Sequence, residues 1–244
     1  RFVFETTIAP AVRDQVADLL AAAPVLLDAD VRLDDPARPV AFALSHPMLT
    51  AKGTAQAGGG VSVAADLAVP DLQPFAALGG VDLRGRTAAH VLASVAGGVT
   101  RIELDGSVSV TGGLAPVPAL VGQDATLGVS AQVAGADLTL SRLAFAGKAL
   151  TLSAHGSSRA GVLDADYKVA LSNLAILAPT LSGAVQAEGH VGGKPDALSL
   201  TTTLHGDVGA PNLPRGPVRL RAALDGLPGA PSGHIEAAGQ LLGA

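Results

Sequence analysis

The chain has 244 residues, of which 48% are hydrophobic and 15% are charged, and its formal net charge is −5. This length and apolar content exclude a disordered chain and are sufficient for a sizeable core. The absence of cysteine excludes disulfides and thiolate metal sites, and the mild acidity with an aromatic content of 2% argues against nucleic-acid binding.

Helical patterns are few and short. The first lies over residues 11–23, where apolar residues recur at helical spacing after Pro10. Two briefer helix-like stretches lie at residues 71–78 and 175–181. Because each of these two spans only one or two turns, we expect them to be connections between strands.

Most of the remaining chain alternates apolar and polar residues with period two, which is typical of half-buried strands. Clear examples are residues 102–105, 108–111, 129–133, 138–141, 150–153, 198–201 and 218–221. Glycine pairs and Pro195-Asp196 separate such runs about every 8–12 residues, as turns do. The pattern predicts an all-β fold of roughly a dozen or more short strands.

Two parts of the chain match each other at an offset of about 100 to 103 residues. Residues 67–72 match residues 169–174, and each segment is followed by a helix-like stretch that ends at Gly80 or Gly183. We interpret this as an internal repeat of about 100 residues, with units at 1–113 and 114–221 and the start of a third unit at 222–244. Such a repeat, built from small aliphatic side chains, predicts a stack of strands with a thin core.

The sequence contains no catalytic signature. No G-x-S-x-G motif, P-loop or dinucleotide fingerprint occurs, and the acidic residues between Asp28 and Asp35 lack the spacing of a calcium loop. The histidines have no metal-ligand spacing, and we expect each on the solvent side of a strand or in a turn: His46, His90, His155, His190, His205 and His234. We therefore expect no enzymatic activity, cofactor or metal.

Residues 182–189 read Ser-Gly, an alternating strand and Gly, and a proline, Pro195, precedes the next strand. Residues 230–239 repeat this pattern, and residues 169–174 form a similar entry to a short helix. In these features the chain resembles the periplasmic region of the TamB/AsmA-like family. The resemblance implies an elongated, U-shaped β-trough with a hydrophobic interior and one open seam.

The resemblance also implies a place and a role. The chain would be a periplasmic piece of a longer, inner-membrane-anchored protein of a Gram-negative bacterium, and another region would meet an Omp85-type outer-membrane partner. The implied roles are the passage of phospholipid between the membranes and the assembly of outer-membrane or autotransporter proteins. Since no run of about 18 apolar residues occurs, we expect no membrane-spanning segment in this sequence.

If a lipid groove exists, one face of the predicted strands would line it and contact phospholipid acyl chains. The candidate lining residues are Val129, Ala131, Val133, Leu138, Leu140, Leu150, Leu152, Val169, Leu171, Leu198 and Leu200. Alternation indicates a buried face without indicating whether protein or lipid buries it. An ordinary packed sandwich, a closed β-solenoid and a structural or adhesin-like stalk are therefore alternatives.

Overall fold

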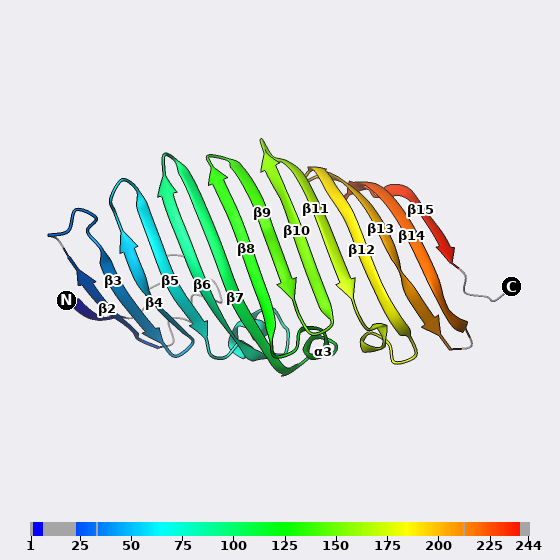
Figure 1. The fold of residues 1–244 in the computed structure, drawn as a ribbon, viewed down its shortest axis with the longest axis horizontal. Coiled ribbons are helices and arrows are strands. Elements are labelled where there is room, and N and C mark those ends of the chain that lie inside the picture. Colours follow the sequence, from blue (N-terminus) through cyan, green and yellow to red (C-terminus); the bar gives the residue numbers. More distant parts are fainter. Residues whose placement is uncertain (1, 7–22, 33, 212, 240–244) are drawn as a thin grey trace. The chain divides into compact units, whose positions relative to one another are not determined.

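The structure, a computed structural model, describes residues 2–6, 23–32, 34–211 and 213–239, and most of these lie in antiparallel strands (Figure 1). The strands are β1 (Phe2–Thr6), β2 (Val25–Val31), β3 (Val40–His46), β4 (Leu49–Gln56), β5 (Val61–Val69), β6 (Leu83–Ala96), β7 (Val99–Gly113), β8 (Ala125–Ala134), β9 (Asp137–Ala146), β10 (Leu150–Arg159), β11 (Val162–Leu171), β12 (Ser182–Lys194), β13 (Ala197–Ala210), β14 (Leu213–Leu227) and β15 (Ser232–Gly239). The predicted all-β class is thus confirmed.

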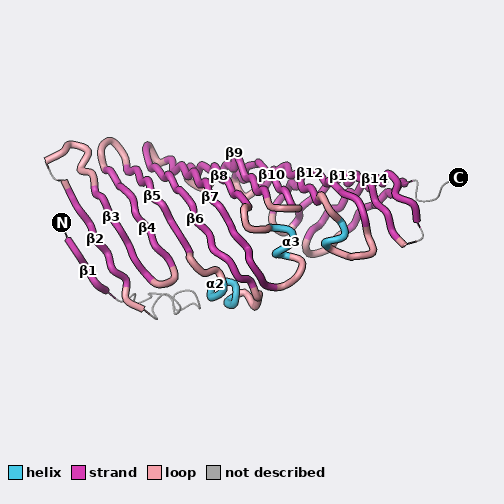
Figure 2. The backbone as a smooth tube through the Cα atoms, turned by 60° about the horizontal axis from the view of Figure 1, so that its bottom comes forward, coloured by secondary structure: helices cyan, strands magenta, loops and turns pink. Residues whose placement is uncertain are grey.

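In the described residues three short helical turns connect strands: α2 (Gln73–Leu78), α3 (Val117–Val121) and the 3₁₀ turn η1 (Leu174–Ile176). The helix α2 confirms the helix predicted at residues 71–78. Figure 2 shows it at the N-terminal end of β6, which follows it in the chain. The stretch predicted at 175–181 is only the single turn η1, which begins where the Asn173 side chain accepts a hydrogen bond from the Ala175 N–H at 3.0 Å. The helix predicted over residues 11–23 falls outside the described residues except for the last one.

The chain divides into two compact units. The first comprises residues 1–118 and 122–128, and the second comprises residues 119–121 and 129–244. Within each unit the strands follow one another in the sheet in sequence order, β1 to β7 in the first and β9 to β15 in the second. The boundaries of the sequence repeat, at residues 113 and 221, stay a prediction.

The antiparallel register aligns apolar side chains across strands. In the second unit Leu152 lies opposite Val169, Val169 opposite Ala187, and Ala187 opposite Leu204. Because successive residues of a strand point to opposite faces of the sheet, this register collects the apolar residues on one face and the polar residues on the other.

Few hydrophobic side chains are buried. Among the described residues they are Val25, Ala65, Val110, Ala125, Ala149, Leu171 and Leu174. In the second unit Leu174 of η1 packs on Ala149 and Leu171, and partly buried side chains such as Leu120 and Val185 surround this cluster. Both units therefore have thin cores built mostly from aliphatic side chains.

Candidate functional site

The second unit has an aliphatic face, which we define by the register of β9 to β15. Its apolar members are Leu138, Leu140, Leu143, Phe145, Leu150, Leu152, Ala154, Leu163, Ala165, Tyr167, Val169, Leu171, Val185, Ala187, Val191, Leu198, Leu200, Leu204, Val208, Val218, Leu220, Ala222, Leu224, Ile235 and Ala237. At the paired positions of these strands, no Asp, Glu, Lys or Arg lies on this face. The face therefore offers no charged group to a ligand.

The first unit has an aliphatic face of the same kind, defined by the register of β2 to β7. Its apolar members are Val25, Leu27, Ala29, Val31, Val40, Phe42, Leu44, Leu49, Ala51, Ala55, Val61, Val63, Ala65, Leu67, Val69, Ala89, Val91, Ala93, Val95, Ile102, Leu104, Val108 and Val110. At the paired positions, its only titratable residue is His46. Both units thus have a face in which aliphatic residues predominate and the other positions are mainly glycine and threonine.

Most of the predicted lining residues lie together on the aliphatic face of the second unit. They are Leu138, Leu140, Leu150, Leu152, Val169, Leu171, Leu198 and Leu200. Val129, Ala131 and Val133 alternate along β8 and share one face of that strand. Leu171 differs from the others because its side chain is buried in the cluster with Leu174.

Parts of the aliphatic faces are open to solvent. Val61 and Ile102 of the first unit expose 51% and 38% of their surface, and Ile235 of the second exposes 63%. In the second unit η1 and Leu120 pack over one part of the face, around Leu171. Exposed aliphatic surface on a sheet face without Asp, Glu, Lys or Arg at its paired positions is the kind of surface that marks an interaction site.

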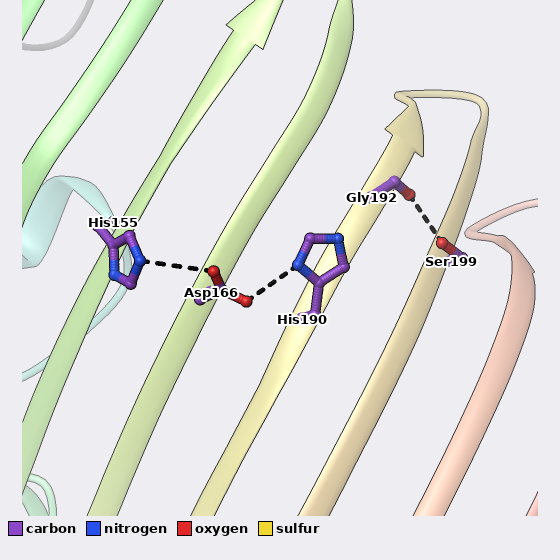
Figure 3. A network of polar contacts seen from close by, with 5 residues as sticks. All are labelled: His155, Asp166, His190, Gly192 and Ser199. Atoms are coloured by element: carbon purple, nitrogen blue, oxygen red, sulfur yellow. Dashed lines mark hydrogen bonds and ion pairs between the residues drawn. The ribbon is translucent and has the colours of Figure 1, made fainter.

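The opposite, polar face carries rows of side chains that contact each other across strands. In Figure 3 Asp166 of β11 lies between His155 of β10 and His190 of β12. Its carboxylate lies 3.4 Å from Nε2 of His155 and 3.0 Å from Nδ1 of His190. One position along the same face, Nζ of Lys168 lies 3.6 Å from Glu188. All of these side chains are substantially exposed, so each pair contributes little to stability.

One histidine corrects the sequence-based expectation. His46 is the last residue of β3 and is buried, with 4% of its surface exposed, whereas we expected every histidine on the solvent side of a strand or in a turn. Its Nδ1 accepts a hydrogen bond from the Met48 N–H at 3.1 Å, and its Nε2 has no hydrogen-bond partner among the described residues. The reason is strand parity, since His46 continues the alternation of Phe42 and Leu44 on the aliphatic face. The alternation that predicts a buried position for His46 can be read from the sequence.

The described residues contain no group of three or more His, Asp or Glu side chains arranged to hold a metal ion. Among the helices in the described part of the chain, none is both long and apolar enough to cross a membrane. The surfaces that the geometry does offer are the two aliphatic faces and the polar faces behind them. No family model, curated protein or solved structure matches this chain.

Proposed function

We propose that the aliphatic faces hold the acyl chains of phospholipid, and that the chain is a periplasmic section of a bridge protein that carries phospholipid between the inner and outer membranes. The observation that supports this most is the aliphatic face of each unit, which carries no Asp, Glu, Lys or Arg at its paired positions and is partly open to solvent. The location and the Omp85-type partner rest on the sequence resemblance to the TamB/AsmA-like family.

The energetics of lipid transfer favour such a surface. Each CH₂ group that leaves a bilayer for water costs about 0.8 kcal/mol, so a sixteen-carbon chain costs roughly 12 kcal/mol. A dry aliphatic face offsets much of this cost. Because Val, Leu and Ala recur from strand to strand without a charge at the paired positions, no single position would hold the acyl chain more tightly than its neighbours.

The composition of the face favours an acyl chain over a protein partner. Protein interfaces are enriched in aromatic residues and arginine, and those residues supply most of the binding energy. At the paired positions of the described strands, the aliphatic face of the second unit has only Phe145 and Tyr167 as aromatic residues. It also carries no arginine at the paired positions. A flexible hydrocarbon chain needs neither aromatic nor arginine side chains to bind.

The assembly of outer-membrane proteins is a second candidate function, supported by the edge strand β15. Every residue of β15 is exposed, and among the described strands it pairs only with β14. An unpaired strand edge can accept an incoming strand through backbone hydrogen bonds. The structural or adhesin-like stalk is the remaining alternative, and it requires no exposed aliphatic surface.

Lipid transfer between two vesicle populations tests the main proposal, with mass spectrometry of the purified protein to detect bound phospholipid. The variant Leu152→Arg places a charge on the aliphatic face, and Ser153→Arg places the same charge on the polar face one residue away. We expect transfer to fall at least about tenfold in Leu152→Arg and to change less than twofold in Ser153→Arg, because a charge in an apolar environment is costly.

Two results would contradict the lipid proposal. One is a preparation that contains no phospholipid and transfers none. The other is equal loss of transfer in the two arginine variants. Circular dichroism of both variants shows whether the fold is retained, and if Leu152→Arg unfolds the protein outright, Leu152 belongs to a packed core and the stalk alternative is favoured.

A further inference from the structure

The polar face of the second unit contains a groove of about 1120 Å³. Two cross-strand rows of polar-face residues line it. The first row is Thr151, Ala170, Gln186, His205, Arg219 and Ala238, and the second is Ala184, Asp207 and Pro217. This volume suits a small organic ligand. The groove lies on the face opposite the one that we propose for acyl chains.

Small side chains create this hollow. Ala170, Ala184, Ala238 and Pro217 occupy positions at which a polar face usually carries long side chains. The next row along the same strands shows the contrast, since it reads Ser153, Lys168, Glu188, Thr203, Arg221 and Glu236. The hollows that this neighbouring row lines are smaller, about 450 and 370 Å³.

The groove has an excess of positive charge. Lys148, Arg215 and Arg219 line it together with one carboxylate, that of Asp207. No salt bridge joins any of these three cations to a carboxylate within the described residues. Three cations around a shallow hollow, without ion-pair partners, form a region of positive potential that favours an anion.

The neighbouring row is balanced. Lys168 lies 3.6 Å from Glu188, and Arg221 lies directly opposite Glu236 in the register of β14 and β15. The charge excess is therefore local to the groove and is not a general property of the polar face.

The first unit has a smaller groove, of about 700 Å³, on its own polar face. Its charged lining is Lys52, Asp66 and Asp105, and Lys52 lies directly opposite Asp66 in the register of β4 and β5. That groove has more carboxylates than Lys and Arg side chains. The two units thus share a hollow, but only the groove of the second unit has an excess of cations.

We propose that the groove of the second unit binds a small molecule that carries a phosphate group. Arginine guanidinium groups bind phosphate oxygens in a bidentate manner, and Arg215 and Arg219 supply two of them at one end of the groove. The Gln186 amide, the His205 ring and the Thr151 hydroxyl add further hydrogen-bonding groups along its length. The small residues of the floor leave room for the rest of the molecule.

Isothermal titration calorimetry of the whole chain with inorganic pyrophosphate tests this site. We expect saturable binding with a dissociation constant of about 1 mM or tighter. The variant Arg219→Gln should weaken binding at least about fivefold. The control Arg221→Gln, two residues along the same strand, removes the same charge from the balanced row and should change the affinity less than twofold. If Arg219→Gln fails to fold, Lys148→Gln tests the same groove from the connection between β9 and β10.

Three results would overturn the proposal. The first is the absence of saturable pyrophosphate binding at 10 times the expected dissociation constant. The second is equal weakening by Arg219→Gln and Arg221→Gln, which indicates nonspecific attraction to the whole face. The third is binding to phosphatidylglycerol vesicles without binding to pyrophosphate, which assigns the cations to a membrane surface. The first two results do not depend on whether the aliphatic faces carry lipid. In the third, the vesicle binding must be lost in Arg219→Gln to be assigned to the cations, because binding through the aliphatic faces would survive that substitution.

Discussion

The ring of His190 lies 3.0 Å from the carboxylate of Asp166, and the same contact joins His90 to Asp66 at 2.9 Å, one hundred residues earlier in the chain. In both units the contact joins neighbouring strands, β11 with β12 and β5 with β6. Both pairs lie on the polar face of their unit. Neither pair was predicted from the sequence, and the repeat of about 100 residues stays a prediction.

We predict that the His190 and Asp166 pair contributes little to stability. A double-mutant cycle with His190→Gln and Asp166→Asn should give a coupling free energy of about 0.2–1 kcal/mol, because both side chains are about half exposed and solvent screens their interaction. Urea unfolding of the parent, the two single variants and the double variant measures this coupling free energy. A coupling free energy above about 3 kcal/mol would contradict this prediction and would show that the pair contributes strongly to stability.

Gly189 should be intolerant of any side chain. A Cβ atom there would collide with the Thr201 carbonyl oxygen of β13 and would lie 2.8 Å from the Tyr167 hydroxyl. We expect Gly189→Ala to destabilise the protein by about 2 kcal/mol or more, since the backbone must move. Gly229→Ala is the control, because no atom lies within 4 Å of its added Cβ. In thermal unfolding its melting temperature should stay close to that of the parent.

Leu174 should be a stability residue and not a lipid-contacting one. Its side chain is 6% exposed and packs on Ala149 and Leu171. Leu174→Ala should lower the free energy of unfolding by about 2–5 kcal/mol through a cavity. Leu177→Ala, three residues away at a position that is 55% exposed, should cost less than about 1 kcal/mol. Equal effects in denaturant titrations would show that the small core does not hold η1 in place.

The edge strand β15 gives a prediction for the second candidate function. Ile235 is 63% exposed, so Ile235→Lys should change the free energy of unfolding by less than about 0.5 kcal/mol. A lysine on an exposed edge discourages the addition of another strand. If β15 receives incoming strands, the variant should crosslink to a β-strand peptide less efficiently than the parent does. Unchanged crosslinking would remove β15 from that role.

Alternation along the chain predicted the strands well because period two is a local signal. Residues 150–153 and 198–201 were predicted from it and lie within β10 and β13. The helix α3 was not predicted, since five apolar residues that include Pro118 carry no helical period. Its existence depends on packing with distant residues, such as the hydrogen bond from the Ala149 N–H to the Leu120 carbonyl.

The aliphatic face and the groove differ in how far the sequence could predict them. The face was predictable in large part, because parity along each strand assigns Leu150, Leu152, Leu198 and Leu200 to one side. The groove was not predictable, because it needs the register between strands. Arg219 and His205 are fourteen positions apart in the sequence, and only the pairing of β13 with β14 places them side by side.

Site-specific photocrosslinking at two adjacent residues tests the central claim most directly. A photoreactive amino acid at Leu200 would lie on the aliphatic face, and the same amino acid at Thr201 would lie on the polar face. In cells, or with phospholipid vesicles, the account predicts lipid adducts at position 200 and few or none at position 201, as detected by mass spectrometry. Equal labelling at both positions, or no lipid at position 200, would contradict a lipid-carrying aliphatic face.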